Sequence, residues 1–283
     1  MAVQHTIARP FALEGVGVHN GARVRVQVSP RDADSGIVFV RTDIAGAPIR
    51  AHADAIAATA NATVLRGADG ASVSTVEHLL AAAFGLAIDN LLVEIDGPEM
   101  PILDGSAAPF VAALDAGGRA AQDAPRRVMR MRRAIVVADG AKSARLEPAE
   151  AGFALDVTIR YDDPAIGVQR ETCDLTPETF RAEIAPARTF GRMADLDILH
   201  AKGMGLGASL ENTIAVDGGR IVNPEGLRLP NEFVRHKMLD VVGDMALLGA
   251  PLIGRFVGDQ CGHGLNARLV RAVLDQPDAY DWV

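Results

Sequence analysis

The stretch NEFVRHKMLDVVGDMALLG, residues 231–249, carries the strongest local signal in this sequence. Its apolar residues recur three and four positions apart, which predicts an amphipathic helix whose buried stripe is formed by Val234, Met238, Val241, Val242, Met245 and Leu248. Gly249 and Pro251 predict where this helix ends. Three polar residues, His236, Asp240 and Asp244, are four positions apart, so they form one row on the face opposite the stripe.

This row of one histidine and two aspartates has two interpretations. A solvent-exposed helix face also shows polar residues at this spacing, with weak contacts between neighbours. Such a face usually mixes lysine with glutamate, whereas an imidazole and a carboxylate one turn apart, as in His236 and Asp240, can chelate one divalent ion. That ion needs a further ligand from elsewhere in the chain. Gly243, beside the row, leaves room for something to approach the helix closely.

The segment VSTVEHLL, residues 73–80, offers the further ligand in His78. Its residues 74–77 also fit a capping box, in which the Glu77 side chain bonds back to the start of a helix and His78 is an ordinary first-turn residue. In the other interpretation, Glu77 stands beside a metal-binding histidine and serves as the general base of a hydrolase. The residues alone leave both roles open.

A third histidine follows the predicted metal helix in the run QCGHG, residues 260–264. Glycine on both sides of His263 predicts a loop that lets the ring project into a cleft. An incidental loop histidine is the alternative.

The order of predicted elements indicates an α+β protein with two similar domains. Alternating residues predict strands near 23–28, 37–40, 91–95, 128–137 and 153–159, and helices are expected near 77–86, 107–116, 176–184 and 234–248. The small, polar stretch 117–127 reads as a linker. We therefore expect an N-terminal domain over 1–120 and a C-terminal domain over 126–283, each a small sheet layered with helices, with the site where they meet.

Composition excludes several classes of protein. The chain has 283 residues, 49% of them hydrophobic and 23% charged, which is typical of a globular protein with a sizeable core. The net charge of −8 disfavours binding of nucleic acid. Two distant cysteines make no disulfide framework, the N-terminus lacks the apolar core of a signal peptide, and no apolar run reaches the roughly 20 residues of a membrane span. A cytoplasmic protein is expected.

Five segments together resemble a known family. They are VSTVEHLL, IDNLLVEIDGPEMPILDGSAAPFV, ARTFG, NEFVRHKMLDVVGD and GHGLN, which occur in order within about residues 4–280. They resemble the zinc-dependent UDP-3-O-acyl-N-acetylglucosamine deacetylases of lipid A synthesis in Gram-negative bacteria. The resemblance implies a hydrolase that removes acetate from the glucosamine nitrogen of a UDP-sugar carrying a 3-O-hydroxyacyl chain.

The resemblance also implies a role for each candidate residue. One zinc ion per chain, with ferrous iron as the alternative, is bound by His78, His236 and Asp240, the trio that the spacing also suggests. Glu77 takes the proton of the attacking water. His263 is protonated and stabilises the oxyanion, and it is also a candidate general acid. The carboxylate of Asp244 holds this imidazole, and Thr189 of ARTFG donates a hydrogen bond to the oxyanion.

Substrate contacts are predicted from position, since Lys237 follows a proposed ligand and Lys142 lies in the turn after Gly140. Lys237 is expected at the diphosphate or sugar, Phe190 against the sugar or nucleotide, and Lys142 is a further basic candidate. For each the alternative is structural: a solvated lysine, or a core phenylalanine. The glycine-rich run 203–207 lies in a segment near 190–216 that resembles the family's acyl-chain insert, and a flexible surface loop is the alternative. The expected partner is the acylated UDP-glucosamine substrate, with no nucleic acid, a monomeric state, and transient contact with a membrane surface through the acyl chain.

Two other functions compete with the deacetylase. A zinc peptidase is disfavoured because no HExxH motif, with both histidines on one helix, is present. A non-catalytic nucleotide-sugar-binding protein would use the same histidines and aspartates only as structural residues.

Overall fold

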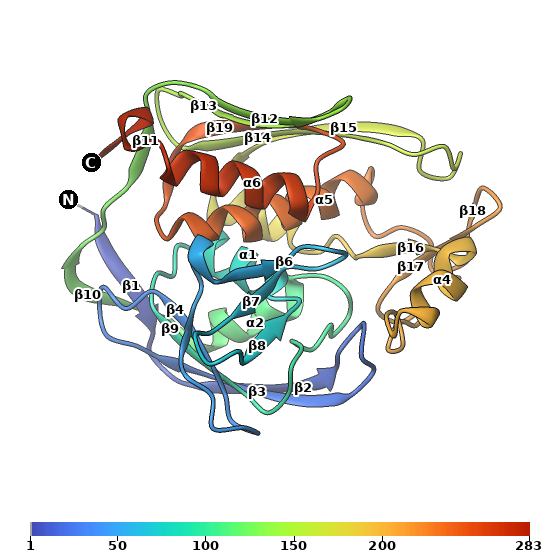
Figure 1. The fold of residues 1–283 in the computed structure, drawn as a ribbon, viewed down its shortest axis with the longest axis horizontal. Helices are drawn as coiled ribbons and strands as arrows, with labels where there is room; N and C mark the ends of the chain where they lie inside the picture. Colours follow the sequence, from blue (N-terminus) through green and yellow to red (C-terminus); the bar gives the residue numbers. More distant parts are fainter. Residues whose placement is uncertain (1) are drawn as a thin grey trace.

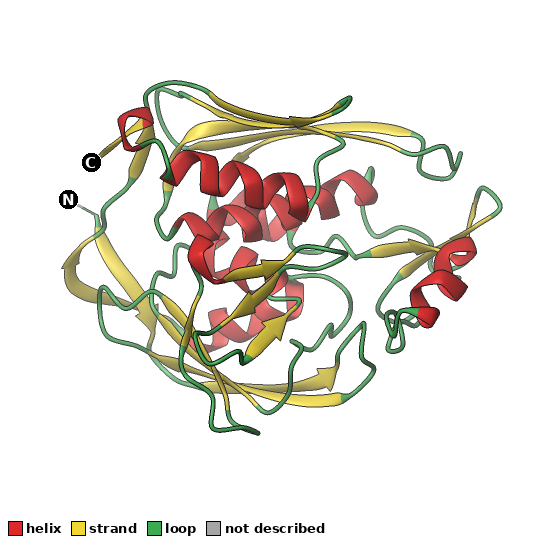
Figure 2. Ribbon diagram, viewed as in Figure 1, coloured by secondary structure: helices red, strands yellow, loops and turns green. Residues whose placement is uncertain are grey.

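Two β-sheets form the outer layers of the molecule, and helices from both halves of the chain fill the space between them (Figure 1, Figure 2). The computed structural model describes residues 2–283. Its mixture of separate sheets and helices confirms the predicted α+β class. The division into two domains at 1–120 and 126–283 stays a prediction.

The sheet of the N-terminal half has five strands. Their order is β2 (Phe11–Val16), β3 (Arg23–Pro30), β9 (Leu91–Ile95), β4 (Ile37–Arg41) and β5 (Ile49–Arg50). In β3 the predicted alternation is confirmed, because Val24, Val26 and Val28 are buried and Arg23 and Arg25 are exposed. This face packs on the helices.

The sheet of the C-terminal half has seven strands. They are β12 (Ile135–Asp139), β13 (Lys142–Glu147), β19 (Leu252–Asp259), β11 (Met129–Met131) and β20 (Tyr280–Trp282) in one path, with β14 (Phe153–Arg160) also pairing with β19, and β15 (Val168–Leu175) pairing with β14. β14 runs parallel to β19. After β15 the chain passes through α5 (Glu232–Met245) to β19, and then through α6 (His263–Leu274) to β20 of the same sheet.

The helices occupy the middle of the molecule. The longer ones are α1 (Glu77–Gly85), α2 (Ala108–Gly117), α5 (Glu232–Met245) and α6 (His263–Leu274). The short ones are α3 (Pro177–Thr179), α4 (Leu196–Ala201), a π-helical turn at Phe180–Ile184, and 3-10 turns at Ala53–Ala55, Met193–Asp195, Ala246–Leu248 and Pro277–Ala279. α1 of the first half packs against α5 of the second. No helix among residues 2–283 is long and apolar enough to cross a membrane.

Three small sheets join these layers. They are β6 (Ile56–Ala58) with β7 (Val64–Arg66) and β8 (Ser72–Ser74), β16 (Phe190–Arg192) with β17 (Ile214–Asp217) and β18 (Arg220–Ile221), and β1 (Val3–Ile7) with β10 (Arg119–Pro125). The last pair corrects one expectation. The stretch 117–127, read as an irregular linker, contains a strand because its backbone pairs with the N-terminal strand. The small and polar residues of this stretch can form a strand, but they show no hydrophobic alternation that would predict one.

Candidate metal centre

Three predicted ligands come together where α1 packs on α5. His78 lies on α1, and His236 and Asp240 lie one turn apart on α5. One ligand atom from each lies within 4.8 Å of the others. All three side chains are buried, with exposed fractions of 4%, 2% and 3%. The alternative of a solvated helix face is therefore wrong, because α5 is covered by other elements on this side as well.

Gly243 explains how the two helices approach so closely. A Cβ atom at this position would collide with the carbonyl oxygen of Glu77. The segment for which Gly243 leaves room is therefore the first turn of α1. This contact brings His78 to the row on α5.

The protonation states of these residues fit a divalent cation. His236 Nδ1 donates to the Ala187 carbonyl oxygen at 3.1 Å, so Nε2 carries the lone pair, and this atom lies 3.6 Å from Asp240 Oδ1. Burial lowers the pKa of His236, which favours its neutral form beside Asp240. Burial, together with His236, lowers the pKa of His78 to about 3, so its imidazole is also neutral. Its Nδ1 is buried without a hydrogen-bond partner in the described chain. Two neutral imidazoles and a carboxylate whose ligand atoms lie within 4.8 Å of one another are a donor set that a bound metal ion would satisfy.

Lys237 forms an ion pair with Asp240, the third proposed ligand. Its Nζ lies 2.7 Å from Asp240 Oδ2, which leaves Oδ1 facing His236. Burial disfavours both charges, but the attraction within the pair outweighs burial. It raises the pKa of Lys237 and lowers the pKa of Asp240 relative to their ordinary values. Asp240 is therefore an anion near two neutral imidazoles.

A second cluster lies beside the metal residues and contains Glu77, His263 and Asp244. His263 Nδ1 lies 2.9 Å from Asp244 Oδ2, and His263 Nε2 lies 3.5 Å from Glu77 Oε1. Burial opposes the charge on His263, but Asp244 and Glu77 outweigh it and raise the pKa of this imidazole to about 10. Burial raises the pKa of Glu77 to about 7, although His263 opposes this rise. The cluster thus pairs a charged imidazole with a carboxyl group that titrates near neutrality.

Two local expectations are corrected here. Glu77 is not part of a capping box: α1 begins after Val76, which makes no side-chain cap, while Thr75 Oγ1 donates to Glu99 Oε1 at 3.1 Å. His263 is not in a loop but is the first residue of α6. Gly262 is extended and ends the preceding connection, so the run QCGHG marks a helix start.

Two residues of this cluster were missed by the sequence analysis. Thr63 Oγ1 donates to Asp244 Oδ1 at 2.7 Å, and Asn266 Nδ2 donates to Asp244 Oδ2 at 2.8 Å. Asn266 is one turn past His263, a spacing that indicates proximity on α6. Thr63 stands between an irregular segment and β7, and no periodicity singles it out.

Phe190 lies beside His236, and Thr189 precedes it in a segment that is fixed to α5. Arg188, only 1% exposed, forms an ion pair with the fully buried Glu232 at the start of α5, with Nε and Oε1 2.9 Å apart. Thr189 is partly buried and follows the carbonyl group that orients His236 by two residues. The Phe190 ring meets the His236 ring edge-on with centroids 6.2 Å apart.

The two lysines differ in position. Lys237 Nζ lies 5.4 Å from the centroid of the Phe190 ring, so both are at the edge of the metal centre. Lys142 is exposed at the turn between β12 and β13. In the described chain, no hydrogen bond or ion pair joins Lys142 to the metal residues or to the Glu77 cluster.

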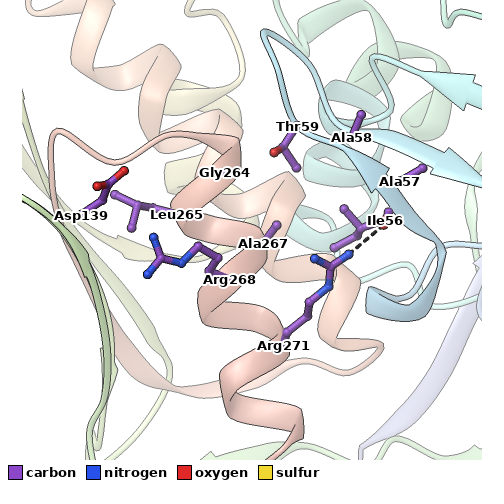
Figure 3. Close-up of a pocket in the computed structure, with 10 residues that line it drawn as sticks. All are labelled: Ile56, Ala57, Ala58, Thr59, Asp139, Gly264, Leu265, Ala267, Arg268 and Arg271. Carbon is purple, nitrogen blue, oxygen red and sulfur yellow. Dashed lines mark hydrogen bonds between the residues drawn. The ribbon is translucent and has the colours of Figure 1, made fainter.

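A cavity of about 320 Å³ lies between β6 and α6, next to the start of that helix (Figure 3). Arg271 Nη2 donates to the Ile56 carbonyl oxygen at 2.7 Å, and Arg268 Nη2 donates to the Ala138 carbonyl oxygen at 3.0 Å. These bonds tie α6 to β6 on one side and to the β12–β13 hairpin on the other. They fix the helix that begins with His263.

Comparison with known proteins decides the family. The family described as UDP-3-O-acyl N-acetylglycosamine deacetylase (LpxC) matches residues 4–275. The chain belongs to the LpxC family. The match includes both clusters described above, so the resemblance of the five sequence segments is confirmed as membership of the LpxC family.

Relatives in three bacteria carry the name UDP-3-O-acyl-N-acetylglucosamine deacetylase. The chain is 51% identical to the one from Phenylobacterium zucineum (strain HLK1), over 98% of this chain and 95% of that protein. It is 47% identical to the one from Myxococcus xanthus (strain DK1622), over 99% and 89%. It is 48% identical to the one from Brucella ovis (strain ATCC 25840 / 63/290 / NCTC 10512), over 99% and 98%. The LpxC similarity thus extends over nearly the full length of each pair.

Proposed function

We propose that this protein is a zinc-dependent deacetylase of lipid A biosynthesis. It hydrolyses the N-acetyl group of UDP-3-O-(3-hydroxyacyl)-N-acetylglucosamine, which yields the free amine and acetate. The observation that carries this proposal is the LpxC match over residues 4–275, which includes a buried His–His–Asp cluster beside a carboxyl–imidazole pair. A peptidase of the HExxH type is disfavoured because His78 and His236 lie on different helices.

His78, His236 and Asp240 would hold the zinc ion, one per chain. Two neutral imidazoles and one carboxylate are a ligand set of catalytic zinc sites, and Fe²⁺ fits the same donors. When bound, the ion supplies Lewis acidity, which lowers the pKa of a coordinated water and polarises the substrate amide.

Glu77 and His263 divide the proton transfers in this proposal. Glu77 Oε1 accepts a proton from the attacking water as the water oxygen bonds to the amide carbon. A pKa of about 7 suits this task, because a base that titrates near the working pH is most effective. The charged His263 stabilises the negative amide oxygen. As the carbon–nitrogen bond breaks, Glu77 or His263 gives a proton to the leaving amine. Asp244 keeps His263 charged, and Thr189 donates to the same oxygen.

Substrate binding is assigned to the residues around the metal centre. Lys237 attracts the diphosphate, and Phe190 packs against the sugar or nucleotide. Lys142, at the tip of the β12–β13 hairpin, is a more distant basic contact. The insert near 190–216, which contains β16, α4 and most of β17, projects from the side opposite the chain termini and would hold the acyl chain (Figure 1). Arg192 within it pairs with Asp195, with Nε and Oδ2 2.7 Å apart.

The two cysteines suit a cytoplasmic location. Cys173 and Cys261 are buried and free, which suits a reducing cytoplasm. We expect a monomer that meets the membrane surface only through its acylated substrate.

Acetate release tests this function directly. Purified protein is incubated with UDP-3-O-acyl-GlcNAc of several acyl-chain lengths, before and after removal of metal by a chelator. We expect acetate from the untreated protein, loss of release after chelation, and recovery with one equivalent of Zn²⁺ per chain. Parallel recovery with Fe²⁺ determines which metal supports faster turnover. A protein that binds the nucleotide sugar but releases no acetate would be a binding protein, and the proposal would be wrong.

A further inference from the structure

Thr63 contacts two of the proposed catalytic groups at once. It ends the connection between β6 and β7 and is only 1% exposed. Its Oγ1 donates to Asp244 Oδ1 at 2.7 Å, and its backbone N–H donates to Glu77 Oε2 at 3.2 Å. One residue from the first half of the chain therefore links α1 to α5 through polar atoms.

The hydroxyl group of Thr63 completes the hydrogen bonding of Asp244. Asp244 Oδ2 already accepts from His263 Nδ1 at 2.9 Å and from Asn266 Nδ2 at 2.8 Å. With Thr63 on Oδ1, both oxygens have donors, so the carboxylate cannot rotate without breaking a bond to a charged group. Thr63 Oγ1 also lies 3.3 Å from His263 Nδ1. The angle of the His263 ring, and hence the direction of its Nε2 toward Glu77, follows from this arrangement.

The backbone N–H of Thr63 binds the second catalytic group, Glu77. This N–H occupies Glu77 Oε2, while Glu77 Oε1 is the oxygen that lies 3.5 Å from His263 Nε2. The next residue, Val64, begins the middle strand of a three-stranded sheet and pairs with Ala58 and with Ser74. Thr63 is thus held by strands on both sides, which gives its two donors a fixed separation.

We propose that Thr63 is a positioning residue for the deacetylation: its hydroxyl group fixes Asp244 and through it His263, while its backbone N–H selects the free oxygen of Glu77. This inference rests on the proposed function for its kinetic consequence. Thr63 needs no contact with the substrate, because it acts through the two groups that move protons.

The test compares Thr63→Val, which keeps the shape and the backbone N–H but removes the hydroxyl, with Thr63→Ser, which keeps the hydroxyl. We expect kcat for acetate release to fall by about 10- to 100-fold in Thr63→Val, the factor that corresponds to one lost hydrogen bond to a charged group. KM and metal content should stay at the wild-type values, and Thr63→Ser should recover most of kcat.

Thr6→Val is the matched control. Thr6 is also a buried threonine, and its Oγ1 donates to the Asn90 carbonyl oxygen at 2.7 Å, away from the metal centre. We expect it to lower thermal stability about as much as Thr63→Val does, but to leave kcat unchanged. Equal kcat losses in the two valine variants, or a Thr63→Ser enzyme as slow as Thr63→Val, would overturn the proposal.

Nitrogen-15 NMR of the His263 imidazole separates this inference from the proposed function, because it needs no turnover. The Nδ1 resonance should shift in Thr63→Val and return in Thr63→Ser. An unchanged Nδ1 resonance in Thr63→Val overturns the positioning role. A wild-type protein that releases no acetate, but shows the NMR shift, contradicts only the proposed function.

Discussion

His78 and His263 are both largely buried and lie in adjoining clusters, yet they have opposite protonation states. The pKa of His78 is lowered to about 3, whereas the pKa of His263 is raised to about 10. Burial disfavours the charge on both. The difference comes from the neighbours: His78 faces another imidazole, His236, while His263 lies between the carboxyl groups of Asp244 and Glu77.

This contrast teaches that the neighbours assign the role of each histidine. A neutral imidazole keeps a lone pair and can bind a metal ion, whereas an imidazolium has only donors and can stabilise negative charge. The proposed metal ligands and the proposed acid–base residues therefore differ in chemistry although both sets use α1 and α5. Variants on the two sides should fail in different ways.

The largest effect is expected on the metal side. His236→Ala removes the lone pair that faces Asp240, so the site keeps only two protein ligands and should lose its stoichiometric metal, and acetate release with it. Metal analysis of the purified variant, at wild-type metal supply, checks this. His52→Ala, which removes a histidine outside both clusters, is the matched control and should keep full metal content. Full metal in His236→Ala would show that this residue is not a ligand.

A smaller loss is expected on the acid–base side. Glu77→Gln preserves shape and can still accept from the Thr63 backbone N–H, but it cannot take a proton. We expect kcat to fall by about 10²- to 10⁴-fold, the usual contribution of a general base, with metal content unchanged. Metal analysis and kinetics on the same preparation separate the two sides. If Glu77→Gln loses its metal, the two clusters are not independent and the comparison fails.

The metal side was largely predictable from the sequence, because local spacing carries it. His236 and Asp240 are one helical turn apart, and Gly243 indicated that something approaches this helix closely. Which segment made that approach could not be derived from spacing, since it depends on tertiary packing of α1 on α5. The segment VSTVEHLL offers His78 as the further ligand, and the family resemblance implies the remaining roles.

The acid–base side was less predictable because its contacts join distant segments. Thr63 lies 181 residues before Asp244, and nothing local to it indicates that its hydroxyl group meets a carboxylate. The glycines around His263 predicted a loop, and this was wrong: Gly262 precedes α6, but His263 and Gly264 are its first two residues. Likewise, β10 exists because β1 pairs with it, and a pairing across more than 100 residues leaves no periodic signal in a short stretch of small residues.

The smallest expected effect is a change of pH dependence in Asp244→Asn. Asp244 is the carboxylate that raises the pKa of His263 most, so its neutral replacement should lower that pKa. The charged imidazole is present below its pKa and is lost as the pH rises through it, which places its loss near pH 10 in the wild-type protein. The alkaline limb of kcat/KM should therefore move toward lower pH in the variant.

Asp115→Asn is the matched control for that shift, because it removes the same charge from an ion pair with Arg181 at the surface. Its pH profile should coincide with that of the wild-type protein. The measurement is kcat/KM for acetate release across the alkaline range, since kcat/KM reports the ionisations of the free enzyme. If Asp244→Asn leaves the alkaline limb in place, the charge on His263 does not depend on Asp244. The contrast between the two histidines would then rest on Glu77 and Asp240, the other carboxyl groups that raise the pKa of His263.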